Sequence, residues 1–360
     1  MDYKKVCYII SVQEKYGGLK TFNLGLVNAI AENINKTKGE FFLIVNEKYK
    51  KEFSEIPFVK IIYFKMHRLI FENLYLFSHL KRISPDLTIF PNNRVPFFFN
   101  HKSTSVIIHD LQFWRYPQNY SNFKYYFRKI ALNNAILKSN KIFSISTFTK
   151  NELVKYGCEK KIKVINEGFN DEIKPIKPEI RDSIKKIKNY NFFFYIGSKS
   201  KHKNLINLIK AFTIFNDNKK FHLVLAGAQT NNKRRYLKAI ENSSQKDWII
   251  DLNQVNDSEK SFLFKNCFSF VFPSIYEGFG LPVLEAWHYE KLIIASNTGN
   301  LKYLCKEAGL LVGSSYLEIL EGLNSAFHNS EEHKIFIVAG KKKLEKFTWL
   351  NTASLILQGI

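Results

Sequence analysis

The chain has 360 residues, of which 45% are apolar and 24% charged, and a formal net charge of +22. This length suits two domains that each bury a core, and the composition excludes a disordered or fibrous protein. The sequence contains no run of 18 apolar residues, no recognisable signal peptide and no cysteine pair with metal-site spacing, so we expect a cytoplasmic protein with packed, reduced thiols.

Short apolar runs alternate with amphipathic stretches along the chain, which predicts βαβ units and an α/β fold. Residues 168–190 carry two prolines and many charges, so they are predicted to link two Rossmann-like domains, 1–168 and 187–346. A final helix is predicted within 347–360. The predicted strands are 5–11, 40–46, 58–63, 86–90, 104–109, 141–145 and 162–165 in the first domain, and 192–197, 221–226, 248–251, 268–272, 292–295 and 308–312 in the second.

Three segments of the first domain place polar or small residues after a strand, where ligands bind in open α/β sheets. Gly17 and Gly18 follow the first strand, and His109 and Asp110 follow the strand 104–109. Ser146 ends the strand 141–145, and Thr149 is a candidate helix cap. Each segment also has a purely structural interpretation, because a lone histidine or a capping serine is common in cores and at helix ends.

In the second domain, the segment FFFYIGSKSKHKNL predicts a buried strand and a basic loop that opens a helix. Lys203 lies at that helix start, where a cation opposes the helix dipole and therefore calls for a functional reason. Its alternative role is that of an ordinary surface lysine.

The segment 268–290, FSFVFPSIYEGFGLPVLEAWHYE, combines a buried strand with a glycine-containing loop and a helix that starts near Pro282. Gly278 and Gly280 allow backbone N–H groups to approach an anion at the helix N-terminus. Glu277 and Glu285 flank this site, so its ligand must supply hydroxyls as well as phosphate, and a nucleotide sugar does both. The alternative is that Glu277 is a solvated loop acid and that Glu285 is an acid in the first helical turn.

These segments resemble glycosyltransferase family 4, whose members are retaining enzymes of the GT-B fold. EGFGLPVLE, 277–285, resembles its Glu-x7-Glu signature; HKNL, 202–205, its diphosphate-binding element; HDLQFWRYP, 109–117, its first-domain histidine segment; and SNTGN, 296–300, its phosphate-side loop. Ser198 stands where many members have arginine, so Lys199 or Lys201 is the candidate second cation. The resemblance implies two Rossmann-like domains facing a central cleft, with the final helix crossing back to the first.

The resemblance also implies roles for individual residues. The catalytic set comprises His109 against the transferred sugar and Glu277 at its hydroxyls. Glu285 accepts from the ribose, and the amides of Phe279, Gly280 and Leu281 face sugar and phosphate. The remaining substrate-binding set is Gly17, Gly18, Asp110, Ser146, Ser198 and Lys203.

The predicted function is transfer of a hexose, with mannose as a candidate, from a nucleoside diphosphate sugar to a glycan or lipid-linked acceptor in surface polysaccharide assembly. No cofactor, metal or nucleic acid is expected. A glycoside hydrolase using Glu277 and Glu285, a basic nucleic-acid-binding protein and a sugar-nucleotide epimerase remain as alternatives.

Charge adds one candidate partner. Residues 1–170 hold 27 Lys and Arg against 13 Asp and Glu. This excess of positive charge could bind an anionic membrane that carries the acceptor, or it could merely solvate the surface. The segment 122–138, NFKYYFRKIALNNAILK, combines basic and aromatic residues and fits either the membrane interface or packing against the sheet, with packing the favoured interpretation.

Overall fold

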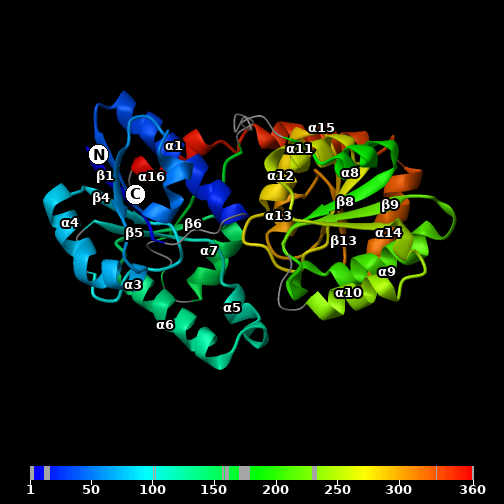
Figure 1. Cartoon of the computed structure of the whole chain (residues 1–360), viewed down its shortest axis with the longest axis horizontal. Coiled ribbons are helices and arrows are strands. Elements are labelled where there is room, and N and C mark those ends of the chain that lie inside the picture. Colours follow the sequence, from blue (N-terminus) through cyan, green and yellow to red (C-terminus); the bar gives the residue numbers. More distant parts are fainter. Residues whose placement is uncertain are drawn as a thin grey trace. The chain divides into compact units, whose positions relative to one another are not determined.

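The computed structural model describes residues 4–11, 17–99, 101, 103–155, 158, 162–169, 179–228, 233–329 and 331–358. The chain divides into two compact units: Met1–Asn170 with Phe347–Ile360 forms unit 1, and Asp171–Lys346 forms unit 2 (Figure 1). The terminal segment therefore belongs with the first unit, and each unit contains its own parallel sheet.

Seven strands of the described part of unit 1 form one parallel sheet in the order β3-β2-β1-β4-β5-β6-β7. The interior strand β1 has five buried residues of six, because helices cover both faces of such a sheet and the strand must be apolar throughout. The strands are β1 (Lys5–Ile10), β2 (Glu40–Asn46), β3 (Lys60–Phe64), β4 (Leu87–Phe90), β5 (Thr104–Ile108), β6 (Lys141–Ser144) and β7 (Ile162–Val164).

The helices of unit 1 include α16, which packs against α1 although the two are at opposite ends of the sequence. The contact is close at Trp349, which is 1% exposed. The helices are α1 (Gly18–Lys36), α2 (Lys50–Phe53), α3 (Arg68–Ile70), α4 (Leu76–Ile83), α5 (Gln112–Arg115), α6 (Asn122–Lys138), α7 (Thr147–Val154) and α16 (Trp349–Leu357).

The described strands of unit 2 form a parallel sheet in the order β10-β9-β8-β11-β12-β13. This is the doubly wound order of a Rossmann sheet, in which the strand order reverses between β8 and β11 and ligands bind outside the strands' carboxyl ends. The strands are β8 (Phe192–Ile196), β9 (His222–Ala226), β10 (Ile249–Asn253), β11 (Ser269–Phe272), β12 (Leu292–Ser296) and β13 (Leu310–Val312).

The helices of unit 2 cover this sheet, with α9 packed against α14 and α12 against α15. They are α8 (Asp182–Lys185), α9 (Leu205–Phe215), α10 (Lys233–Glu241), α11 (Asp257–Asn266), α12 (Leu281–His288), α13 (Leu301–Leu304), α14 (Tyr316–His328) and α15 (Lys334–Leu344). Every predicted strand of both units is present within two residues of its predicted bounds, and the predicted α/β architecture is confirmed.

The predicted linker needs a correction. Residues 170–178 lie outside the described residues, but residues 179–190 pack onto unit 2 and do not form a free connection. Ile184 and Ile187 are buried, and Arg181 donates two hydrogen bonds to the Glu259 carboxylate. Two isoleucines in a charged segment are a weak sequence signal, yet they are enough to anchor one turn of helix.

The cysteines are buried, and burial raises the pKa of Cys267 and Cys305 to about 12. Among the described helices none combines the length and apolar character needed to cross a membrane. The described His, Cys, Asp and Glu side chains also contain no cluster of three or more arranged to hold a metal ion.

Candidate functional site

The loop between β11 and α12 carries the acidic segment of unit 2, and its conformation depends on Gly280. This residue is the N-cap of α12 with φ 119°, and a Cβ there would lie 3.1 Å from the Leu301 side chain. Any other residue would be strained by both its φ angle and the available space. Gly280 has no side chain to cap α12, and the positive end of this helix follows the carboxyl end of β11 in the chain.

A second loop, residues 296–300 after β12, supports the first. Asn300 Nδ2 donates to the Phe279 carbonyl over 2.7 Å, and Thr298 Oγ1 donates to the Ile275 carbonyl over 3.2 Å. Gly299 has φ 55° and lies against Glu277, whose backbone N would be 3.4 Å from a Cβ at position 299. The predicted loop 296–300 therefore fixes the position of Glu277.

Lys203 and Glu277 are brought together at the point where the strand order of the unit 2 sheet reverses. Lys203 follows β8 and Glu277 follows β11, and Lys203 Nζ lies 2.5 Å from Glu277 Oε1. Their side chains are only 12% and 14% exposed. A cation and a carboxylate, both partly withdrawn from water, thus share one edge of the sheet.

The neighbouring His202 links the segment between β8 and α9 to the loop after β11, since its carbonyl accepts from the Ile275 N–H over 2.8 Å. Burial and the adjacent Lys203 ammonium lower the pKa of His202 to about 4. The imidazole is therefore neutral near pH 7, and it adds no charge to the Lys203–Glu277 pair.

Glu285 has a different partner, which the sequence analysis missed. Lys260, on α11, places its Nζ 2.6 Å from Glu285 Oε1 and 3.3 Å from Asp257 Oδ1. Burial alone would lower the pKa of Lys260, but the two carboxylates raise it above its usual value. Only the Asp257–Lys260 spacing on one helix was visible in the sequence, and it gave no reason to connect α11 with Glu285.

The candidate second cations near Ser198 differ in their surroundings. Lys199 is buried and pairs with Asp251 in the middle of β10, so its charge is already compensated inside the unit. Lys201 is exposed. Ser198 Oγ lies 3.0 Å from Ser200 Oγ, and the Ser198 carbonyl accepts from the Tyr195 hydroxyl over 3.0 Å.

In unit 1, His109 lies after β5 and is held on several sides. Its backbone N–H donates to Asn93 Oδ1 over 2.6 Å, and Nε2 lies 2.7 Å from the Pro91 carbonyl. A carbonyl only accepts, so Nε2 carries a proton. Nδ1 is 3.8 Å from Glu167 Oε1, and the Phe22 ring packs edge-on at 4.6 Å between centroids.

The other predicted residues of unit 1 have local roles. Asp110 Oδ1 accepts from the Gln112 N–H over 3.0 Å, and Gly17 is the N-cap of α1 with φ 108°, directly before Gly18. The predicted cap needs a correction: Ser146, not Thr149, caps α7 by accepting from the Thr149 N–H over 3.0 Å. Thr149 instead donates to the His109 carbonyl over 3.2 Å.

Of the predicted site residues, Gly17, Gly18, His109, Asp110 and Ser146 lie in unit 1. Ser198, Lys203, Glu277, Phe279, Gly280, Leu281 and Glu285 lie in unit 2. Asn93, Glu167 and Lys260 are the main additions that the sequence did not indicate.

The chain is similar to known glycosyltransferases. Residues 176–343 match the family described as Glycosyl transferases group 1. The chain is 22% identical to O-antigen chain mannosyltransferase B of Escherichia coli over 71% of its own length and 70% of that protein. It is 26% identical to O-antigen chain mannosyltransferase RfbU of Salmonella typhimurium over 54% of its length and 52% of the relative.

Among solved structures, Anabaena HepE in complex with UDP-glucose has a TM-score of 0.74 at 15% identity, covering 98% of each chain. This likeness concerns the fold, and together with the two Rossmann-type sheets it confirms the predicted GT-B fold.

Proposed function

We propose that this protein is a glycosyltransferase of surface polysaccharide assembly. It transfers a hexose, which the names of its relatives suggest is mannose, from a nucleoside diphosphate sugar to a glycan or lipid-linked saccharide. The observation that carries the proposal is the Lys203–Glu277 pair at the reversal point of the unit 2 sheet. It offers a cation for a diphosphate beside a carboxylate for sugar hydroxyls.

In this proposal unit 2 binds the donor. Lys203 has three N–H donors, so it can contact a diphosphate oxygen while it keeps Glu277 in place. Glu277 then accepts from hydroxyls of the transferred sugar, and Glu285, oriented by Lys260, accepts from the ribose. The amides of Phe279, Gly280 and Leu281 approach the phosphate at the N-terminus of α12.

Unit 1 binds the acceptor, with His109 against the transferred sugar. Both ring nitrogens of His109 already face protein oxygens, at Pro91 and Glu167. The imidazole therefore contributes a fixed surface, and we do not assign it a proton transfer. We propose retention of the anomeric configuration, as in glycosyltransferase family 4, with the leaving phosphate as the base for the acceptor hydroxyl.

We also propose that the reaction needs no metal ion, since Lys203 and the α12 amides supply positive charge where the diphosphate lies. The two acids do not suit a glycoside hydrolase, because each carboxylate is paired with its own lysine.

Finally, we propose that unit 1 attaches to an anionic membrane on its cytoplasmic face through α6. This helix buries Ala131, Leu132 and Ala135 and leaves an apolar face exposed to solvent. The exposed side chains, which we call the α6 apolar face, are Phe123, Tyr126, Phe127, Ile130 and Leu137, and Lys124, Arg128 and Lys129 lie on the same helix.

The test is a thermal-shift panel of nucleosides, nucleoside diphosphates and their sugars, followed by transfer assays. We expect one nucleoside diphosphate sugar at 100 times its Kd to stabilise the protein by about 2.7 kcal/mol. Lys203→Ala should weaken the diphosphate far more than the nucleoside, and transfer should persist in excess EDTA. Glycoside hydrolysis without nucleotide, or transfer restored only by Mg²⁺, would contradict the respective part of the proposal.

A further inference from the structure

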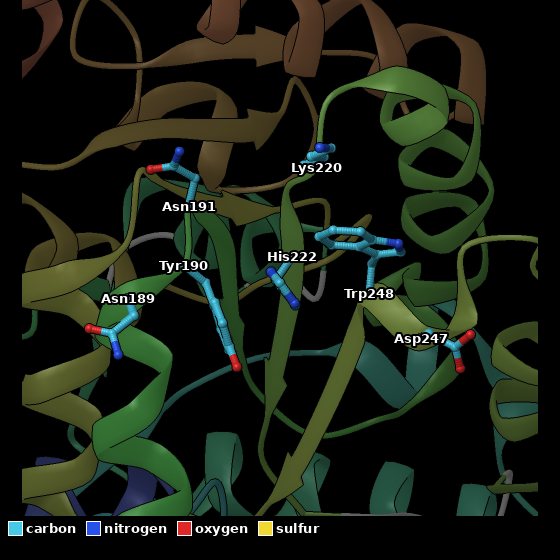
Figure 2. A pocket seen from close by; sticks show the side chains of 7 residues that line it. All are labelled: Asn189, Tyr190, Asn191, Lys220, His222, Asp247 and Trp248. Atoms are coloured by element: carbon cyan, nitrogen blue, oxygen red, sulfur yellow. The ribbon is translucent and has the colours of Figure 1, made fainter.

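Unit 2 has a cavity of about 530 Å³ that is open to solvent and that the proposed reaction does not use. Its lining comes from the residues that precede or begin three adjacent strands, β8, β9 and β10 (Figure 2). Because these strands are parallel, the cavity lies at the amino-terminal edge of the sheet, and Lys203 and Glu277 lie beyond its carboxyl edge. A five-residue strand spans roughly 16 Å, so the cavity is separate from the proposed donor site.

Three aromatic rings form the centre of the cavity. His222 stacks on Tyr190 at 4.2 Å between centroids and lies 4.8 Å from the Trp248 ring. Figure 2 shows the three rings in a row across the strand starts. Tyr190 is 41% exposed, so the row ends in an open aromatic face. Burial lowers the pKa of His222, which keeps this row uncharged near neutral pH.

The polar groups around the rings can both donate and accept. Asn189 and Asn191 carry amides on the Tyr190 side, and Lys220 and Asp247 carry opposite charges on the Trp248 side (Figure 2). A phosphate-rich ligand would require an excess of cations, whereas a polyhydroxyl ligand needs donors and acceptors together. The volume also falls within the range of roughly 300–1,000 Å³ typical of ligand sites.

We propose that this cavity is a second saccharide-binding site. The C–H face of a sugar ring packs on Tyr190 and Trp248, and its hydroxyls bond to Asn189, Asn191, Asp247 and Lys220. In this proposal the occupant is a distal part of the growing glycan, an assignment that rests on the proposed function. The site would hold a long acceptor at a second point, which raises the effective concentration of its reacting end.

The test measures binding by calorimetry with neutral oligosaccharides of mannose, glucose, galactose and N-acetylglucosamine, two to eight units long. At least one series should bind with an affinity that rises with length. Tyr190→Ala and Trp248→Leu should each weaken it at least tenfold. The double variant Asn189→Ala/Asp247→Ala should do the same with the rings intact, which covers the case in which a ring variant fails to fold. Tyr316→Ala is the matched control, because Tyr316 is 36% exposed in the same unit but lies outside the cavity.

Three outcomes would overturn the proposal: no binding by any series, equal binding by wild type and all cavity variants, or displacement of the sugars by a single-stranded oligonucleotide that binds the rings more tightly. Nucleoside diphosphate affinity, measured on the same samples, should not change in the cavity variants. If the wild-type protein binds nucleotide sugar but no saccharide series, the cavity proposal alone is refuted. Absence of nucleotide-sugar binding would instead refute the proposed function.

Discussion

Glu277 and Glu285 each face a lysine from a different part of unit 2, Lys203 before α9 and Lys260 on α11. Each carboxylate therefore has its own cation before any ligand binds. The two acids are therefore held by different contacts, and substitutions at each should have different effects.

Glu277→Gln should lower the transfer rate at least about tenfold, which corresponds to near 1.4 kcal/mol of transition-state stabilisation. The neutral amide accepts more weakly from sugar hydroxyls, but Lys203 stays available, so nucleoside diphosphate affinity should be retained. Steady-state kinetics and calorimetry measure the two quantities. Glu290→Gln is the control, since Glu290 pairs with Lys341 at the surface of the same unit. An unchanged transfer rate would show that Glu277 does not contact the sugar.

Lys260→Met should destabilise the protein by about 3 kcal/mol, at the lower end of the range for breaking a buried pair, because it leaves Glu285, whose side chain is only 15% exposed, without a cation. Glu285→Leu in the same chain should restore much of this stability by removing the stranded charge. It should not restore nucleotide affinity, for which the proposal requires the Glu285 carboxylate. Urea unfolding and calorimetry test both statements, and full nucleotide affinity in the double variant would remove Glu285 from the site.

His202 should make unit 2 less stable in mild acid. Its folded pKa of about 4 lies below its usual 6.5, so the fold favours the neutral ring. The stability present above pH 6.5 is therefore lost as pH falls toward 4, by about 3 kcal/mol in full. His202→Gln should flatten the pH dependence of Tm over this window. An equally steep dependence in the variant would assign the acid sensitivity to other groups.

At the level of elements, α6 packs against the core along one narrow stripe, as the favoured interpretation predicted, and leaves its other apolar side chains exposed. Tyr125 packs against the core, but Tyr126, Phe127 and Ile130 remain exposed, because the residues that meet the core are the small stripe of Ala131, Leu132 and Ala135. The Phe97 ring, from the loop after β4, lies 6.4 Å from the Phe127 ring and extends the α6 apolar face. A surface of this kind suits the boundary between lipid headgroups and acyl chains.

If α6 binds membranes, the protein should sediment with anionic but not neutral vesicles. Binding should weaken as salt rises and the Debye length falls from about 10 Å at 0.1 M to about 3 Å at 1 M. Replacing Lys124, Arg128 and Lys129 together by Glu should abolish sedimentation without unfolding. Matched reversal of Lys334, Lys341 and Lys342 on α15 of unit 2 is the control. Sedimentation that salt and the α6 reversal leave unchanged would contradict the proposal.

At the level of the whole molecule, the chain returns to its first unit at its end. Trp349 of α16 fills a space that two glycines leave open: a Cβ at Gly25 would lie 2.3 Å from the indole, and one at Gly168 would lie 2.2 Å from the Trp349 backbone N. Thr352 Oγ1 donates to the Asn166 carbonyl over 2.5 Å, so a hydrogen bond also joins α16 to the segment before Gly168. Unit 1 is therefore completed by a segment that follows unit 2 in sequence.

Trp349→Ala should lower the free energy of unfolding of unit 1 by about 3–5 kcal/mol, because it opens a cavity beside Gly25 and Phe22. Trp287→Ala should do the same in unit 2, where the Trp287 Nε1–H donates to the Ala308 carbonyl over 3.0 Å. Calorimetry of the two variants should show different transitions shifting, and Leu350→Ala, at a 39% exposed position, should change neither. A common shift in both variants would mean that the units unfold as one.

The sequence alone determined where the strands lie along the chain, to within two residues. A parallel strand covered on both faces must be apolar along its length, so each one stands out as a short apolar run. It also indicated the loop of Glu277 and Gly280, because the glycines, the proline of the first helical turn and the nearby acids are local features of the sequence. The resemblance to glycosyltransferase family 4 rested on those same local segments.

Only the tertiary structure decided which side chains meet. The partner of Glu285 lies 25 positions away on another helix, and that of Lys199 lies in the middle of β10; neither pairing follows from the spacing of residues. The aromatic cavity is likewise assembled from three strand starts far apart in sequence. Such contacts depend on how parallel strands align and how helices pack on them, and a linear pattern contains no record of those distances. The exposed face of α6 has the same origin, since the choice of buried stripe is made by the sheet that the helix meets.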